Sequence, residues 1–455
     1  MSESLMSAQP PLEFIPPALN PWILRGCQQI LPFWLQWQTN ITEIQAKNVE
    51  ILADLYQQFQ QKKVRILLAF RHPSVNDPYC MGYLIWKLLP QVAKQKNIPL
   101  NGLIHAHFMY DRGIPLWAGS TVGWLYAKLG GTPIQRGKLD IAGLRSARDL
   151  LVNSQFPLAA APEGATNGHN EIVSPLEPGI AQLGFWCVED LQKANRNETV
   201  FIVPIGIQYH YVTPPWEEIS KLLTQLEIDT GVITEKDNNQ QLITDEKVLY
   251  QRLYQLGEKL LGLMEDFYQK FYHKPLPDDS NKDLSERLPN LMNVALEVAE
   301  SYFNLQPKGN FINRCRRLEQ AGWDCIYRED FKEGNQVSLV EKTLGDRIAE
   351  EATLRMWHMR IVESFVAVTG YYVKEKPSAE RFAETTLLLW DLVARIQGNN
   401  PFFRPQIGKQ TVTMTIGNPL SVSDRLTDYK ASRRQAVANL TQELQTVLEE
   451  MISRL

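Results

Sequence analysis

Apolar runs of strand character alternate with helical stretches through the first half of the chain, and this alternation constrains the fold more than any other feature. The apolar runs predict strands at 64–70, 103–110, 156–162 and 200–209. The segments between them predict helices at about 79–96, 117–129, 140–154 and 179–194. This order is typical of an α/β fold with a mostly parallel sheet flanked by helices. In such sheets, ligands bind at the carboxyl ends of the strands.

A helical segment is predicted ahead of the alternating region. Asn20 and Pro21 form an N-cap followed by a proline at the first helical position, which predicts a helix to about Trp37. A second helix is predicted from Thr42, where Gln45 completes a capping-box pattern. We therefore expect residues 1–61 to form an N-terminal helical hairpin.

The strand pattern stops after Tyr211, and helical patterns broken by proline and glycine follow. It returns in QTVTMTIGNP at 410–419, and the tail closes with a helix. We therefore predict that 62–213 and 406–455 form one α/β domain. Residues 214–405 are then a large, mostly helical insertion.

The composition excludes several classes of protein. The net charge is −4, only 22% of residues are charged and no long run of one sign occurs, so nucleic acid is not an expected partner. The 5 cysteines show no C-x-x-C spacing, which favours reduced thiols in the cytoplasm over disulfides or a structural metal site. We expect no secretory signal and no transmembrane helix.

Aromatic residues are concentrated on the first predicted helix, namely Trp22, Phe33, Trp34 and Trp37. An interfacial helix uses such side chains to lie at the depth of lipid headgroups, which predicts peripheral association with a membrane surface. Interfacial helices are usually rich in lysine and arginine, whereas this one has only Arg25. Packing of the helix against the α/β domain is the alternative interpretation.

The segment R-H-P-S-V-N-D-P contains the first candidate for chemistry. His72 follows a predicted strand, and Asp77 comes five positions later at a predicted helix start. An imidazole can remove a proton from an alcohol, and a carboxylate on its other nitrogen fixes the tautomer and stabilises the imidazolium. The same interval separates His273 and Asp278, in a proline-rich connector. Asp77 also suits simple capping of the helix, and the two roles are compatible.

Three further segments are weak signals when each is taken alone. In G-T-P-I-Q-R-G, Arg136 can hold a phosphate or carboxylate, although a surface salt bridge is the commoner role. In A-P-E-G-A-T-N-G, Glu163 can accept hydrogen bonds from substrate hydroxyls and Gly164 allows a tight turn. V-P-I-G, at 203–206, is a buried strand with a kink.

The order and spacing of these four segments resemble the glycerolipid acyltransferases of the PlsC type (1-acylglycerol-3-phosphate acyltransferases and relatives). IPLWAGSTVGWLYAKLGGTPIQR is similar to the family's stretch between its first two motifs, EPGIAQLGF to a segment after the third, and TMTIGNPL to its last strand. The resemblance covers about 62–211 and resumes at 410–455, and it does not extend to the helical insertion.

The resemblance implies transfer of a fatty acyl group from acyl-CoA or acyl-carrier protein to the hydroxyl of a lysoglycerolipid, in phospholipid biosynthesis. His72 is then the general base and Asp77 its orienting partner. Arg136, Glu163 and Gly164 fall at acceptor-binding positions. No G-x-S-x-G nucleophile elbow occurs, which agrees with direct attack by the acceptor oxygen. The thioester is a substrate, and we expect neither a resident cofactor nor a metal.

The chain departs from the family pattern after Gly164. The family has F-P-E-G-T followed by a basic residue, whereas Ala165, Thr166 and Asn167 stand here. Loss of that cation weakens the case for a phosphate-bearing acceptor. Two alternatives therefore remain, namely the same chemistry on a non-phosphate lipid acceptor and a catalytically silent lipid-binding protein.

Overall fold

The computed structural model describes residues 7–135, 140–233, 244–277, 283–332, 334–366, 368, 370–401 and 404–452 of the 455-residue chain. The chain divides into two compact units. The sheet unit comprises the described residues of 14–135, 139–212 and 409–455. The helical unit comprises 7–13 and the described residues of 213–408.

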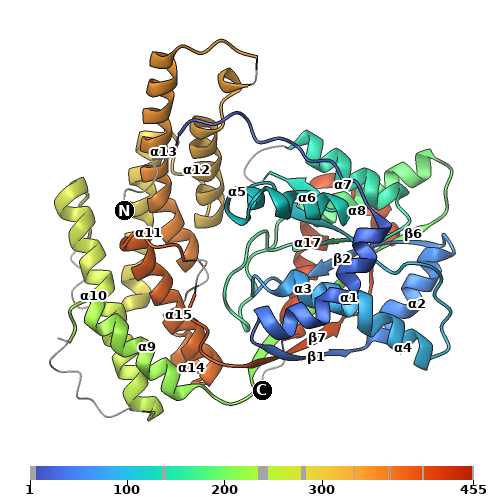
Figure 1. Cartoon of the computed structure of the whole chain (residues 1–455), viewed down its shortest axis with the longest axis horizontal. Coiled ribbons are helices and arrows are strands. Elements are labelled where there is room, and N and C mark those ends of the chain that lie inside the picture. Colours follow the sequence, from blue (N-terminus) through green and yellow to red (C-terminus); the bar gives the residue numbers. More distant parts are fainter. Residues whose placement is uncertain are drawn as a thin grey trace. The chain divides into compact units, whose positions relative to one another are not determined.

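An eight-stranded, mostly parallel sheet forms the centre of the sheet unit (Figure 1). Its order is β1-β7-β6-β2-β5-β3-β4, and β8 also pairs with β6. β6 is antiparallel to β7 and β8, whereas the other described pairs are parallel. The strands are β1 (Ile41–Lys47), β2 (Val64–Phe70), β3 (His107–Asp111), β4 (Thr132–Ile134), β5 (Leu158–Ala160), β6 (Thr199–Tyr211), β7 (Gln410–Ile416) and β8 (Leu420–Ser421).

Helices cover both faces of this sheet (Figure 1). α1, α2, α3 and α4 bury side chains on one face, and α7, α8, α16 and α17 bury theirs on the other. The bounds are α1 (Pro21–Gln38), α2 (Val49–Gln60), α3 (Asp77–Tyr83), a π-helical turn (Leu84–Leu88), α4 (Leu89–Gln95), α5 (Ile114–Ala118), α6 (Ser120–Lys128), α7 (Ile141–Asn153), α8 (Gly179–Lys193), α16 (Leu426–Ala431) and α17 (Arg433–Glu450).

Strand β2 shows how one apolar run supplies both cores. All seven of its residues are buried. Ile66 and Leu68 belong to the core beneath α2, whereas Leu67 and Ala69 belong to the core beneath α7 and α8. Because side chains alternate between the faces of a sheet, a strand in this central position is apolar on both faces, and its one charged residue, Arg65, donates to the carbonyls of Leu151 and Ser154.

The helical unit is built from seven α-helices in its described residues, with a short 3-10 helix at Glu329–Phe331. Its long helix α13 packs against α11 and α12, and α9 packs against α10 and α15. The bounds are α9 (Trp216–Asp229), α10 (Glu246–Tyr272), α11 (Leu284–Tyr302), α12 (Phe311–Ile326), α13 (Leu339–Phe365), α14 (Tyr372–Glu375) and α15 (Ala379–Ile396).

The predicted N-terminal hairpin is wrong in two places. Ile41–Lys47 is strand β1, parallel to β7, and not the first turns of a helix from Thr42. The helix begins only at Val49, although the first helix is confirmed, with the Asn20 side chain accepting from the amides of its first turn. In addition, Gln9 exchanges main-chain hydrogen bonds with residues 326 and 328, so the described start of the chain belongs to the helical unit.

Within the described residues, no helix combines the length and the apolar character that crossing a bilayer requires.

Candidate active site

The candidate site begins where β2 ends, in the middle of the sheet between β6 and β5. The Arg71 N–H donates to the Ile205 carbonyl at 2.9 Å, immediately after the last register pair of β2 with β6. The chain then turns away, and α3 begins at Asp77. His72 and Asp77 therefore lie at the carboxyl end of a central parallel strand, where ligands of α/β sheets bind.

The structure brings His72 and Asp77 together, as the spacing predicted. The His72 Nδ1 lies 2.9 Å from the Asp77 Oδ2, which also accepts the Ser74 N–H at 2.8 Å. The Asp77 side chain is fully buried, whereas 21% of the His72 side chain is exposed. Because the carboxylate is an acceptor, Nδ1 carries the proton in the neutral ring. The described residues offer no hydrogen-bond partner to Nε2, whose lone pair is then available.

Tyr209 completes this group, and the sequence reasoning missed it. Its hydroxyl donates to the Asp77 Oδ1 at 2.6 Å and lies 3.5 Å from the Cys80 Sγ. Burial and the nearby Asp77 carboxylate raise the pKa of Tyr209 well above its usual value, which keeps the phenol a donor. Tyr209 stands in the predicted strand 200–209, in step with the buried Ile205 and Ile207. That alternation predicts its burial but not its partner.

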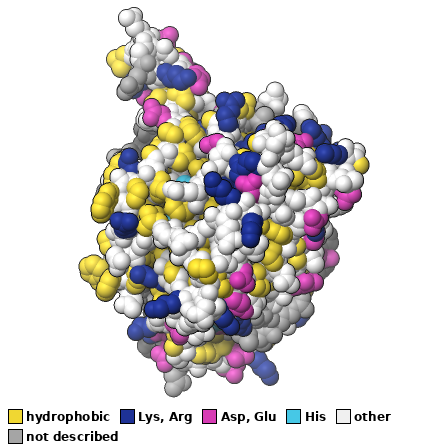
Figure 2. Space-filling model, turned by 90° about the vertical axis from the view of Figure 1, so that its right-hand side faces the viewer, with side chains coloured by type: hydrophobic (Ala, Val, Ile, Leu, Met, Phe, Trp, Pro, Cys, Tyr) yellow, Lys and Arg dark blue, Asp and Glu magenta, His cyan; other side chains and the backbone are white. Residues whose placement is uncertain are grey.

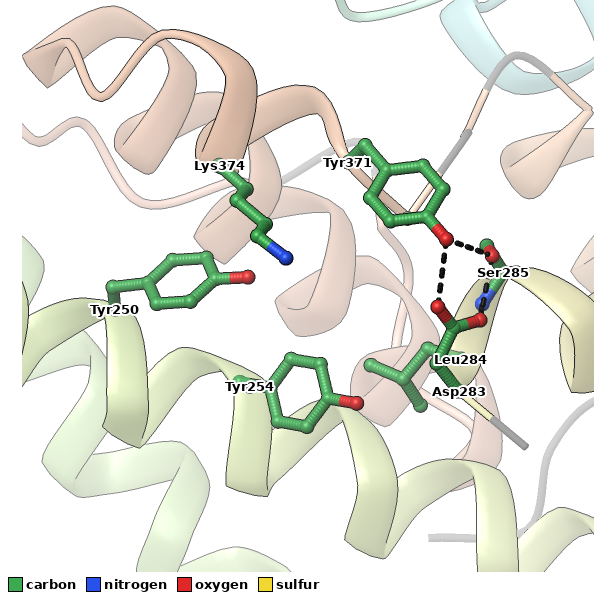
Figure 3. Close-up of a pocket in the computed structure, with 8 residues that line it drawn as sticks. Tyr250, Tyr254, Asp283, Leu284, Ser285, Tyr371 and Lys374 are labelled. Atoms are coloured by element: carbon green, nitrogen blue, oxygen red, sulfur yellow. Dashed lines mark hydrogen bonds between the residues drawn. The ribbon is translucent and has the colours of Figure 1, made fainter. Parts of the chain in front are cut away.

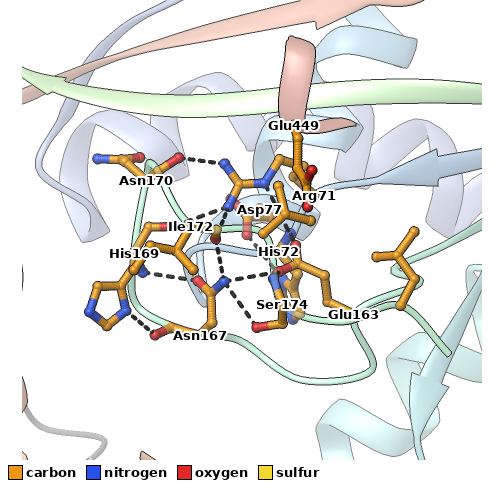
Figure 4. Close-up of polar contacts among 12 residues, drawn as sticks. Arg71, His72, Asp77, Glu163, Asn167, His169, Asn170, Ile172, Ser174 and Glu449 are labelled. Carbon is orange, nitrogen blue, oxygen red and sulfur yellow. Dashed lines mark hydrogen bonds and ion pairs between the residues drawn. The ribbon is translucent and has the colours of Figure 1, made fainter. Parts of the chain in front are cut away.

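Glu163 lies beside His72 and has a fully buried side chain (Figure 4). Its Oε1 accepts the His72 main-chain N–H at 2.8 Å and lies 3.8 Å from the Arg71 Nε. Its Oε2 accepts from the Asn167 side chain and the Ser174 N–H, both at 2.9 Å. This geometry supports a positioning role, and contact of Glu163 with an acceptor lipid stays a prediction.

Arg71 is a second residue that the sequence reasoning missed. Its guanidinium is fully buried and donates to the carbonyls of Asn170, His169 and Ile172 (Figure 4). The Asn167 N–H in turn donates to the His72 carbonyl at 3.4 Å. The loop that follows β5 is therefore bonded both to Arg71, which precedes His72, and to the main-chain carbonyl of His72.

Gly164 occupies a turn that requires a glycine. Its φ is 74°, in the left-handed region that side chains with a Cβ disfavour. Its N–H donates to the Ala161 carbonyl at 3.2 Å, which closes the turn directly after β5. The geometry explains the glycine by backbone conformation, and its place in an acceptor-binding turn stays a prediction.

Arg136, the predicted phosphate contact, lies outside the described residues. Shortly before it, Thr132–Ile134 forms strand β4, which the sequence pattern did not predict. β4 is parallel to β3, which is parallel to β5, and β5 is parallel to β2. Since carboxyl ends of parallel strands share one edge of a sheet, β4 ends at the same edge as β2.

The helical unit contains a separate hollow of about 290 Å³ (Figure 3). The Tyr371 hydroxyl donates to Asp283 at 2.6 Å and contacts the Ser285 hydroxyl at 3.0 Å, and the Lys374 side chain points inward (Figure 3). The lining contains no histidine, so it does not repeat the histidine–carboxylate arrangement. It is formed by Tyr250, Tyr254, Asp283, Leu284, Ser285, Gly370, Tyr371 and Lys374.

We predict that Glu163→Gln lowers the free energy of unfolding by about 3–5 kcal/mol, because it leaves the buried Arg71 guanidinium without its carboxylate. Chemical denaturation of the full chain measures the change. Glu189→Gln is the control, since Glu189 pairs with a largely exposed Arg433 and should cost at most about 1 kcal/mol. Equal stability of the Glu163 variant and the control would contradict the anchoring role.

Searches against protein-family models, curated proteins and solved structures found no match to this chain.

Proposed function

We propose that the protein is an O-acyltransferase of the glycerolipid acyltransferase type, with His72 as general base and Asp77 as its orienting partner. One observation carries the proposal, namely an imidazole that is bonded through Nδ1 to a buried carboxylate and remains partly exposed at the end of a central strand. The motif order that resembles the PlsC-type family supplies the reaction class, and the parallel sheet is compatible with such a fold.

The proposed reaction needs one base and no nucleophilic side chain. The His72 Nε2 takes the proton of the acceptor hydroxyl as its oxygen attacks the thioester carbonyl. Asp77 stabilises the imidazolium that results. The tetrahedral intermediate then collapses, the carbon–sulfur bond breaks, and the imidazolium returns its proton to the departing thiolate. The products are the acylated lipid and the free thiol of CoA or acyl-carrier protein.

The alternative of a silent lipid-binding protein is the less favoured. The buried Asp77 carboxylate accepts from three donors, namely the His72 ring, the Ser74 N–H and the Tyr209 hydroxyl. A buried charge is costly unless hydrogen bonds satisfy it, and lipid binding alone does not require one beside an imidazole. Proton transfer at the His72 Nε2, in contrast, requires a carboxylate that stabilises the imidazolium.

We expect His72→Ala to lower kcat for release of free thiol from acyl-CoA by about 100-fold or more, because general-base catalysis contributes that much. The fold should persist, since the ring is partly exposed. The matched control is His273→Asn, which removes the other histidine standing five residues before an aspartate and suits its left-handed φ of 52°. Near wild-type turnover by the His72 variant would refute the assignment. If the wild-type chain leaves the thioester intact with every lysolipid tested, the result favours a catalytically silent lipid-binding protein.

The acceptor is proposed to be a lysoglycerolipid, with 1-acylglycerol-3-phosphate as the first candidate. One observation favours a non-phosphate acceptor instead, because the residues after Gly164 are uncharged. The Asn167 amide in that stretch already donates to Glu163, the Ile172 carbonyl and the Ser174 hydroxyl. Any phosphate contact at this edge therefore depends on other cations, of which Arg136 is the predicted one.

If Arg136 binds the phosphate, kcat/KM should be about tenfold or more higher with 1-acylglycerol-3-phosphate than with the matching monoacylglycerol, as for a charge-assisted contact. Arg136→Ala should abolish that preference, whereas Arg145→Ala on the exposed face of α7 should retain it. Equal wild-type rates with both acceptors would move the proposal to a non-phosphate lipid.

Peripheral association with a membrane surface is part of the proposal and is supported by α1. Trp22, Phe33 and Trp37 are 77%, 73% and 85% exposed, although Leu24 and Leu31 bury the opposite side of the helix. α1 has no acidic residue in its sequence. Figure 2 shows hydrophobic side chains gathered in the left half of the face that it presents. Aromatic side chains on such a helix suit insertion at headgroup depth.

Replacing Trp22, Phe33 and Trp37 together by alanine should weaken binding to liposomes of anionic and zwitterionic phospholipid by about tenfold or more. Turnover of a water-soluble, short-chain acceptor should stay within about twofold, because the three side chains lie outside the His72 group. Substituting the comparably exposed Phe271, Leu339 and Val340 of the helical unit provides the control. Equal loss of liposome binding in both triple variants would show that α1 is not the contact surface.

A further inference from the structure

We propose that Tyr209 is a positioning residue for acyl transfer, which holds the Asp77 carboxylate in the orientation that makes His72 a base. The inference rests on the function proposed above and adds a third member to the pair. It is carried by a continuous line of hydrogen bonds from the Tyr209 hydroxyl through both Asp77 oxygens to the His72 Nδ1.

The first argument concerns the Asp77 carboxylate, which is fully buried. A buried charge needs hydrogen-bond donors at both oxygens. Oδ2 receives the His72 ring and the Ser74 N–H, whereas Oδ1 receives the Tyr209 hydroxyl alone among the described residues. Loss of that hydroxyl leaves Oδ1 unsatisfied and removes a contact that fixes the orientation of the carboxylate toward the imidazole.

The second argument concerns how Tyr209 is itself held. β6 extends beyond the last residue that pairs with β2, Ile205, so the edge of β6 at Tyr209 would lack a partner there. The Asn170 side chain fills this place, because its Oδ1 accepts the Tyr209 N–H and its Nδ2 donates to the Tyr209 carbonyl, both at 2.8 Å. The Asn170 carbonyl accepts from Arg71, which precedes His72.

Tyr209 is thus fixed at its main chain and at its hydroxyl, and the contacts at both ends lead back to His72. A residue needed only to fill space requires neither feature. Such double fixation is what pre-organisation of a catalytic group demands, because an orienting partner must not itself move.

The third argument concerns proton affinity. Asp77 stabilises the imidazolium through its contact with Nδ1, so a carboxylate that is no longer held in this orientation should stabilise the imidazolium less and lower the pKa of His72. Apart from Tyr209 on β6, the ionisable groups around the imidazole stay the same in that variant. They are Asp77 and Cys80 on α3, Arg71 between β2 and His72, and Glu163 after β5.

The decisive experiment is Tyr209→Phe in the full chain, which keeps the ring and removes the hydroxyl. The imidazole titration of His72 is followed by NMR, with its signal assigned by its loss in His72→Ala. We expect the pKa of His72 to fall by about half to one unit. The acid limb of the kcat/KM profile should move to lower pH by the same amount. At neutral pH, kcat should fall about fivefold or more with KM within twofold, because the substrate does not touch Tyr209.

The matched control is Tyr56→Phe. Tyr56 is an equally buried tyrosine of the sheet unit whose hydroxyl donates to the His105 carbonyl at 2.8 Å and accepts the His105 N–H at 3.0 Å. Its loss should reduce stability without moving the titration of His72. A second control combines Tyr209→Phe with Asp77→Asn, in which the tyrosine substitution should add no further change to the pH profile.

The outcomes separate cleanly. An unchanged His72 titration in Tyr209→Phe, or a loss of rate matched by Tyr56→Phe, overturns the positioning role. If Tyr209→Phe unfolds, Cys80→Ala replaces it in the test, because Cys80 contacts the Tyr209 hydroxyl. Loss of that contact should shift the pKa of His72 in the same direction. An unchanged pKa in this variant overturns the proposal. A shifted titration in a chain without acyltransferase activity would retain the inference and reject the proposed function.

Discussion

Two buried carboxylates hold His72, one at its ring and one at its main chain, and the rest of the site depends on them. Asp77 binds the imidazole, whereas Glu163 binds the main-chain N–H of the same residue. Neither carboxylate is exposed to solvent, so each needs hydrogen-bond donors from the chain. Without them, the free energy of desolvating the charge would destabilise the fold. Asp77 uses a tyrosine and a loop amide, and Glu163 lies beside the Arg71 guanidinium and accepts from an asparagine and a serine amide. Because every oxygen of the two carboxylates accepts at least one hydrogen bond, the ring and its main chain are held in one arrangement.

The unequal lengths of the central strands create the room for this arrangement. β2 ends at Phe70, opposite Ile205, while β6 continues to Tyr211. The difference leaves an edge of β6 that a loop can occupy, and the loop after β5 does so through Asn170. A parallel neighbour of full length would have covered this edge and excluded the loop. The end of β2 therefore explains why the loop residues, the histidine and the tyrosine meet at a single point although they are far apart in sequence.

The sequence predicted the local parts of this site better than the long-range ones. The largely apolar run 64–70 and the following His72–Asp77 interval are local signals, and the strand and the contact are both present. Tyr209 could not be assigned to Asp77, because a period of two indicates a face of the sheet and says nothing of the neighbour across it. β1 was missed for a related reason: Ile41–Lys47 is mostly polar and pairs with β7, which lies far along the chain. A capping-box pattern there was a local signal that strand pairing overrode.

Burial around the pair falls off in one direction, and this direction bears on how a lipid would reach it. Tyr209 and Asp77 are enclosed, His72 is partly exposed, and Val75, between the two residues of the pair in sequence, is largely exposed. On α3, Tyr79 lies 6.4 Å from the Trp34 ring of α1, measured between ring centroids. The His72 ring itself contacts Phe70 edge-on, with 6.1 Å between the ring centroids. An amphipathic acceptor, as proposed above, would gain from contact with exposed apolar side chains such as Val75 while its hydroxyl meets the imidazole, whereas a fully water-soluble alcohol would not.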